Sequence, residues 1–318
     1  MSYEVVPSKN DFLLFTVMNL AGYNDNNGIL DMHPLRIKTR EHYSGKINNE
    51  IILKFYNEWE KEQPNDMAHP PYGLPEELQR IEHRLERSDK GLANTFLELL
   101  QKFRESTDFD SFYDGEVLPE YEKICGSVKR NIEEADLFKV LNDAWEMVPD
   151  FSYKIIPRPL EACWRGYGPM IDGTAFSFFG PAVKDGKVDF ECRRNLSLLS
   201  HEASHPYMRV VWDGIENRAK ERGMAKELDT FVTKQKAWVY WGKTALQETI
   251  MRAMQARYIN PKIGNSDKCP EVRLIEEHER GFKHIFKADI AIRTHKDTPK
   301  GSLAEDLFDY LERVNFEE

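Results

Sequence analysis

The chain has 318 residues and a net charge of −10, with lysine and arginine interleaved among the acidic residues. This length allows one large domain or two smaller ones, and the lack of a concentrated basic cluster argues against a nucleic-acid-binding protein. The sequence contains no run of eighteen or more apolar residues, so we expect no membrane-spanning helix and no membrane partner.

The cysteines and the first residues of the sequence favour a cytoplasmic protein. The four cysteines are widely spaced and form no Cys-x-x-Cys pair, which is typical of reduced thiols rather than of a disulfide framework. The first residues lack the basic and then apolar order of a secretory signal. We therefore expect the protein in the cytoplasm.

In chain order, the first half of the sequence is predicted to be almost entirely helical. Apolar residues recur at helical spacing in six segments, which are 10–22, 34–44, 48–62, 75–87, 92–105 and 118–147. We place a boundary near residue 148. The chain is thus divided into a helical N-terminal region, residues 1–148, and a second domain, residues 149–318.

Three short segments rich in strand-forming residues follow this boundary, at 151–156, 173–180 and 187–192. Helical patterns then return from Asn195 onward and in the later segments 241–258, 270–292 and 302–314. The predicted fold class is α+β and mostly helical, with one small β-sheet.

The most informative string in the sequence is His201-Glu202-Ala203-Ser204-His205. On a helix, residues four apart lie on one face, so both imidazoles could bind a single ion while Glu202 faces a water on that ion. Zinc suits this arrangement because it binds neutral imidazole and can keep one position open for water. Pro206 follows directly, and we expect the helix to kink or end within a few residues.

A catalytic zinc site needs a third protein ligand, and the best candidate is Glu248. Its segment is strongly helical, and Glu248 lies on a face with large aromatic residues, where an unpaired carboxylate would be costly. Arg252, one turn later, offers a simpler explanation as a salt-bridge partner, although it could also orient Glu248 as a ligand. The rival carboxylates Glu216, Glu221, Glu227 and Asp229 lie in a charged run that is typical of a solvated surface.

These two segments, His201-Glu202-Ala203-Ser204-His205-Pro206 and Glu248-Thr-Ile-Met-Arg252-Ala253, resemble the gluzincin clan of zinc metallopeptidases. More narrowly, they are similar to an uncharacterised gluzincin-like family with a domain of unknown function. The resemblance is most specific between residues 150 and 260. It implies a zincin-like metal-binding domain at 149–318 and a gluzincin-like core.

The resemblance also implies the roles of the site residues. His201, His205 and Glu248 would be the zinc ligands and Glu202 the general base. In such enzymes an edge strand holds an extended peptide by strand addition, and residues 173–180 are our candidate for it, although an ordinary buried hairpin explains them equally well. One departure concerns the 42 residues between His205 and Glu248, where well-studied members have about twenty. This insertion bears on substrate access more than on metal binding.

The predicted function is that of a zinc-dependent hydrolase, namely a metallopeptidase that acts on a peptide or protein substrate through water activated by Glu202. The sequence leaves the donor to the developing oxyanion open among Tyr207, Tyr240 and Tyr258. Two alternatives stand beside the hydrolase. One is a catalytically inactive metal-binding sensor or partner-binding protein on a zincin fold, and the other is a helical structural protein whose histidines are hydrogen-bonded core residues.

Overall fold

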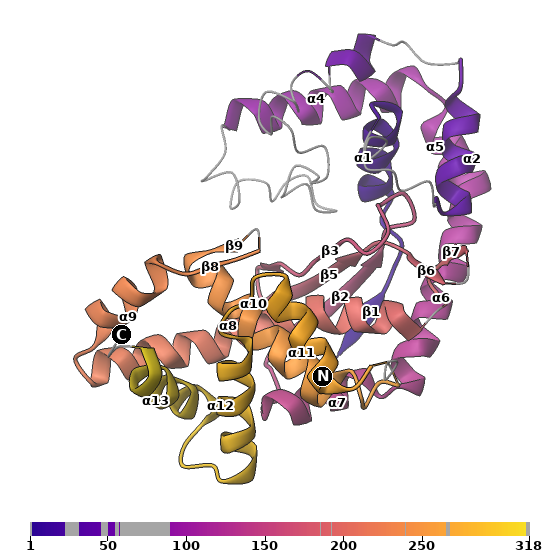
Figure 1. The fold of residues 1–318 in the computed structure, drawn as a ribbon. Helices are drawn as coiled ribbons and strands as arrows, with labels where there is room; N and C mark the ends of the chain where they lie inside the picture. The colour runs from indigo at the N-terminus through magenta and orange to yellow at the C-terminus, as the bar shows by residue number, and fades with distance from the viewer. Residues whose placement is uncertain are drawn as a thin grey trace.

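The computed structural model describes residues 2–22, 32–45, 50–54, 57, 90–184, 186–191, 193–238, 240–264 and 268–315. These residues form a mostly helical structure with three small β-sheets, in agreement with the predicted fold class (Figure 1). Within the described residues, no helix is both long enough and apolar enough to cross a bilayer.

Helices occupy both ends of the described chain and the strands lie mainly between them. The helical elements that precede the main strands are α1 (Lys9–Leu20), α2 (Pro34–Tyr43), α4 (Lys90–Ser106), α5 (Phe109–Phe112), the π-helical turn η3 (Tyr113–Val117), α6 (Leu118–Glu134) and α7 (Leu137–Trp145). Those that follow are α8 (Arg193–Glu221), α9 (Ala225–Thr233), α10 (Gly242–Met254), the π-helical turn η4 (Gln255–Ile259), α11 (Pro270–Glu279), α12 (Ile285–Asp297) and α13 (Leu303–Asn315).

The main sheet has the order β1-β2-β5-β3, with β4 also paired to β5. Its strands are β1 (Tyr3–Val5), β2 (Ser152–Pro157), β3 (Gly166–Tyr167), β4 (Met170–Ile171) and β5 (Thr174–Phe179). The first three strands in this order run parallel, whereas β3 and β4 run antiparallel to β5. Two short hairpins complete the set, β6 (Ala182–Lys184) with β7 (Lys187–Asp189) and β8 (Lys236–Ala237) with β9 (Tyr240–Trp241).

Strands β3 and β4 are two pieces of one edge strand. Both keep the same register on β5, and the interruption between them falls at Gly168 and Pro169. Asp172 and Gly173 then turn the chain into β5, and both have positive φ, as a tight two-residue hairpin requires. The prediction that 173–180 forms the edge strand is therefore wrong, because β5 is paired on both sides and the edge belongs to residues 166–171.

Two large hydrophobic cores meet along α6. The first half of this helix contributes Tyr121 and Cys125 to a core with α1, α2, α4 and α5, and the second half contributes Val128 and Ile132 to a core with α7, α8 and α10 to α13. In Figure 1, α6 runs from the upper helices down beside the sheet to α7. Strand β1 pairs with β2, so the start of the chain completes the sheet that follows residue 148.

Several predicted helices are confirmed, and three predictions about their limits are wrong. Helix α8 continues through Pro206 without a break, because the segment is held in the core on both sides of it. The segment 118–147 is two helices separated by Asp136, and 270–292 is split near Gly281; both residues have positive φ, which an α-helix cannot contain. The predicted helices 48–62 and 75–87 lie largely or wholly outside the described residues.

Candidate metal centre

Helix α8 carries both histidines of the motif and is fixed to the sheet directly beside them. The Tyr153 hydroxyl on β2 donates to the carbonyl of Ala203 at 2.7 Å, and Trp145 Nε1 on α7 donates to Ser204 Oγ at 3.2 Å. These bonds join the motif to its neighbours on β2 and α7. The position of His201 and His205 is thus set by the packing of α8 as well as by their helical spacing.

The structure brings His201, His205 and Glu248 together, although Glu248 comes from a separate helix, α10. His201 Nε2 lies 3.3 Å from Glu248 Oε2, and His205 Nε2 lies 3.7 Å from Glu248 Oε1. One ligand atom of each residue lies within 4.8 Å of the others. Two atoms bound to one tetrahedral zinc at about 2.1 Å would be roughly 3.4 Å apart, so these distances suit a single small cation.

Glu248 is the deepest of these side chains, with 2% of its surface exposed. Its Oε2 has no hydrogen bond among the described residues, although His201 Nε2 and one guanidinium nitrogen of Arg252 each lie 3.3 Å away. A buried carboxylate oxygen without a hydrogen bond is costly unless a cation compensates it. This oxygen is therefore suited to a metal ion.

The proton affinities of the three groups also suit a cation. Burial lowers the pKa of His205 to about 4, which keeps its imidazole neutral near pH 7. Burial would raise the pKa of Glu248, but His201, His205 and Arg252 outweigh it and lower the value to about 2. At His201 burial lowers the pKa, while the Glu248 carboxylate more than reverses this effect and leaves it raised. A metal would compete with that proton for Nε2.

Glu202 lies beside the ligands and is shielded from solvent. Its Oε2 is 3.5 Å from His205 Nε2, and only 4% of the residue is exposed. Burial raises the pKa of this carboxyl to about 7, and Glu248 adds to the effect. A group with this pKa can both accept and release a proton near neutrality, which general acid–base catalysis requires.

The edge strand lies directly on the motif, a feature that the sequence reasoning missed. A Cβ on Gly166 would be 2.4 Å from Glu202 Oε1, and a Cβ on Gly168 would be 2.2 Å from the Glu202 carbonyl and 2.9 Å from the His205 ring. Pro206 has no N–H to donate to that carbonyl, so the helix leaves it open where the strand packs. The signal in the sequence was the pair of glycines around Tyr167 just before a strand.

Arg252 fills the role of a salt-bridge partner and also lies behind the proposed ligand. Its guanidinium contacts Glu248 and, at 3.2 Å, Glu277 Oε2, and it packs over the Phe282 ring at 4.6 Å. The two roles of Arg252 are compatible, because a carboxylate oxygen has two lone pairs and can face both a guanidinium and a metal ion.

The structure also distinguishes among the rival carboxylates and the tyrosines that the sequence left open. Glu216 accepts from Lys243 at 2.7 Å and is one of the surface pairs, as expected of the charged run. Tyr207 donates to Asn142 at 2.7 Å, away from the ligands. Burial of Tyr240, followed by the Glu248 carboxylate, raises its pKa to about 12, so its hydroxyl remains a donor.

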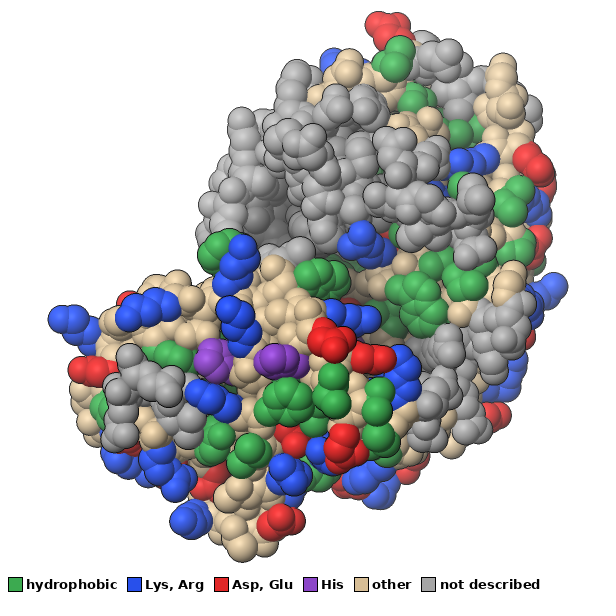
Figure 2. Space-filling view, in the orientation of Figure 1, with side chains coloured by type: hydrophobic (Ala, Val, Ile, Leu, Met, Phe, Trp, Pro, Cys, Tyr) green, Lys and Arg blue, Asp and Glu red, His purple; other side chains and the backbone are tan. Residues whose placement is uncertain are grey.

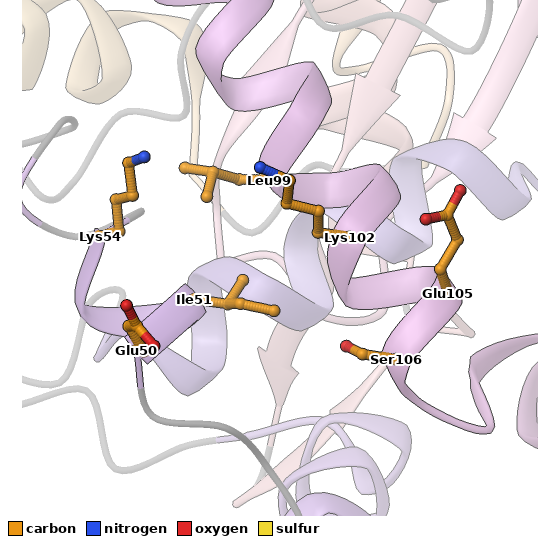
Figure 3. Close-up of a pocket in the computed structure, with 7 residues that line it drawn as sticks. All are labelled: Glu50, Ile51, Lys54, Leu99, Lys102, Glu105 and Ser106. Carbon is orange, nitrogen blue, oxygen red and sulfur yellow. The ribbon is translucent and has the colours of Figure 1, made fainter.

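A separate cavity of about 470 Å³ lies in the N-terminal helical part, beside α4 (Figure 3). Lysine and glutamate side chains surround two apolar residues there, and these six residues are Glu50, Ile51, Lys54, Leu99, Lys102 and Glu105. This mixture is typical of a solvated surface and includes neither histidine nor cysteine. On the face shown in Figure 2, acidic and basic side chains are likewise interspersed over the lower part of the molecule.

Comparisons with known proteins find no match to this chain among protein-family models, curated proteins or solved structures.

Proposed function

We propose that this protein is a zinc-dependent hydrolase, and more narrowly a metallopeptidase with a gluzincin-like core. The observation that carries the proposal is the convergence of His201, His205 and Glu248 from two helices, with Glu202 beside them. Two neutral imidazoles and one carboxylate are a ligand set typical of catalytic zinc, which keeps its fourth position for water. His201, His205 and Glu248 would hold the ion.

When bound, zinc supplies a Lewis acid that lowers the pKa of a water and polarises a carbonyl group. Glu202 would take a proton from the attacking water as the new carbon–oxygen bond forms. It would then return this proton to the amine nitrogen as the carbon–nitrogen bond breaks. The raised pKa of Glu202 supports both steps, because neither protonation state is strongly favoured near neutrality.

Tyr240 is our candidate for the donor that stabilises the oxyanion. Among the three tyrosines that the sequence left open, it is the one whose pKa is affected by both Glu248 and Glu202. Its hydroxyl remains protonated near neutral pH. A fixed donor beside the reacting carbonyl is most effective when the negative charge develops.

The edge strand supplies a surface for an extended peptide. The carbonyl of Pro169 accepts from Phe176 in β5 and that of Arg165 accepts from Gly180 just after β5, at 2.8 Å in each case. The alternate residues Gly166 and Gly168 therefore direct their backbone groups outward. No other described strand pairs with this outer edge. A peptide added here would lie next to Glu202, which supports a peptide or protein as the substrate.

Zinc stoichiometry and a peptide-library screen test the proposal. Protein purified without added zinc should contain close to one zinc per chain, Glu248→Ala should lose most of it, and Glu202→Gln should keep it while cleaving nothing. A zinc-free wild type would refute the proposal. Equal zinc in wild type and Glu248→Ala would refute the assignment of Glu248.

A metal-binding protein without turnover is the second candidate. The observation that favours it is the coverage of Glu202 by Gly166, since a base shielded by a strand must be uncovered before water and substrate meet it. If the wild-type protein binds zinc but cleaves no peptide, this second function is favoured.

A further inference from the structure

We infer that Gln255 is a positioning residue that fixes the hydrogen of His201 on Nδ1 and leaves Nε2 free for the metal. The inference rests on the proposed function, because it concerns the same metal centre. Gln255 begins the π-helical turn η4 that follows α10, and it lies seven residues after Glu248. Seven residues are nearly two helical turns, so both side chains lie on the face of the helix that is directed at α8.

The two ends of the Gln255 amide have different partners on α8. Its Nε2 donates to the carbonyl of Ser197, and it also donates to Ser200 Oγ at 3.2 Å. Its Oε1 lies 3.2 Å from His201 Nδ1. Ser200 Oγ can accept from the amide because its own hydrogen is donated to the Ser197 carbonyl at 2.9 Å.

These partners determine which way the amide points. A carbonyl oxygen only accepts, so the atom of Gln255 that meets the Ser197 carbonyl must be the NH₂ group. The opposite orientation would place two acceptor oxygens in contact. The atom that faces His201 is therefore the amide oxygen, which can only accept, and the hydrogen must be on Nδ1 of His201. Its Nε2 is then the nitrogen that faces Glu248 and is left for the metal.

The π-helical turn explains how Gln255 is held in this place. In a regular α-helix, residues five apart point roughly 140° away from each other. In η4 the wider turn joins them, since the Asn260 N–H donates to the Gln255 carbonyl at 2.9 Å. Asn260 Oδ1 accepts from Ser197 Oγ at 2.8 Å, so both ends of the turn bind the same serine. Single π-helical turns of this kind are frequent at functional sites.

Two substitutions separate this role from ordinary packing. Gln255→Met keeps the volume and removes the strong acceptor for His201. Ser197→Ala removes the hydroxyl bond to Asn260 and a weaker contact of the hydroxyl with the Gln255 amide at 3.4 Å, and it keeps the carbonyl that orients the amide. Zinc affinity should weaken by about 10- to 100-fold in Gln255→Met, which is the usual effect of losing a partner of a metal-bound histidine, and by less than about threefold in Ser197→Ala.

The second measurement observes the hydrogen itself. Long-range ¹H–¹⁵N spectra of histidine-labelled protein at pH 9, with the His201→Ala spectrum for assignment, should show hydrogen on Nδ1 of His201 in the wild type, both with zinc and after chelation. In Gln255→Met, the hydrogen on Nδ1 of His201 should lose its protection from exchange with water.

The outcomes distinguish the inference from the function on which it rests. Wild-type His201 with hydrogen only on Nε2, or a Gln255→Met protein with unchanged zinc affinity, would overturn the role of Gln255. Equal losses of zinc affinity in Gln255→Met and Ser197→Ala would also overturn it, since packing alone would then explain both. A wild type that carries the Nδ1 hydrogen and binds no zinc would instead refute the proposed function. The wild-type spectrum decides the matter even if Gln255→Met fails to fold.

Discussion

Gly166 on the edge strand lies against the carboxylate of Glu202, so closely that a Cβ at this glycine would be 2.4 Å from Oε1 and 2.7 Å from Cδ of Glu202. Real Cβ atoms do not approach other atoms to this distance. The absence of a side chain at residue 166 is thus what allows Glu202 to occupy its position beside His205. The strand and the motif helix determine each other's geometry at this contact.

The first prediction concerns this contact. Gly166→Ala should displace the Glu202 carboxylate and lower kcat/KM for a cleaved peptide by about 100-fold or more, which is the contribution of a well-placed general base. Zinc content should stay at the wild-type level, because the three atoms nearest to the added Cβ all belong to Glu202, which is not a proposed ligand. Gly115→Ala is the matched control, since nothing lies within 4 Å of its added Cβ. Wild-type turnover in Gly166→Ala would contradict the role of Glu202.

The second prediction is that the Glu202 carboxylate lowers the stability of the metal-free protein. Its folded-state pKa, about 7, is above the unfolded value of 4.5, so its contribution to stability is fully present below pH 4.5 and is lost as the pH rises toward 7. Glu202→Gln does not titrate. In chelator-treated protein it should therefore be more stable than the wild type at pH 8, by at most about 3 kcal/mol, with the difference vanishing near pH 4.

Urea unfolding at the two pH values measures this effect. Glu279→Gln, the same change at an exposed residue of α11, should leave the stability within about 0.5 kcal/mol of the wild type at both. A Glu202→Gln protein that is less stable than the wild type at pH 8 would show that the carboxylate is held by favourable contacts rather than by burial.

The third prediction concerns the ion pair that ties α1 to the end of β2. Arg158 donates to both oxygens of Asp11, at 2.7 Å and 3.0 Å, and its guanidinium also packs over the Phe178 ring at 4.1 Å. Asp11→Ala removes the bidentate partner of this buried guanidinium, whose other carboxylate contact, Glu161 Oε2, is longer at 3.7 Å, and it should destabilise the protein by about 3 kcal/mol. Asp110→Ala removes a surface partner of both Lys9 and Arg104 and should cost less than about 1 kcal/mol. Similar losses for the two variants in urea unfolding would contradict this distinction.

The fourth prediction concerns the acid side of the stability curve. His295 is buried between two carboxylates, with Nδ1 2.8 Å from Asp306 Oδ2 and Nε2 2.8 Å from Glu146 Oε2. Burial raises the pKa of Asp306, but the bonds from His295 and from backbone N–H groups outweigh it and leave the pKa lowered. The stability that Asp306 contributes is thus present above pH 3.8 and lost as the pH falls through the lower folded-state value.

Asp306→Asn should therefore destabilise the protein at pH 7, by about 1.5–3 kcal/mol, and by less as the pH falls below 3.8. Asp297→Asn, an exposed position at the end of α12, is the control and should have little effect at either pH. A constant difference between Asp306→Asn and the wild type from pH 7 to pH 3 would show that the titration of Asp306 is not responsible.

The sequence by itself determined the local elements and the chemical character of the centre. The spacing of His201 and His205 is a property of one helix, and the aromatic face around Glu248 is a property of another, so both could be predicted from helical periodicity. The mostly helical fold class followed from the same patterns. The effect of Pro206 on the helix could not be predicted from the local sequence, because the packing that keeps α8 continuous comes from distant segments.

Tertiary structure decided everything that depends on contacts between distant residues. Gly166 and Glu202 are neighbours only because the edge strand packs across α8, and Gln255 reaches His201 only because η4 packs on the start of that helix. Tyr240 is distinguished from Tyr207 by the same kind of contact. Side-chain periodicity gives the face on which a residue lies, whereas which faces meet is set by the burial of apolar surface across the whole chain.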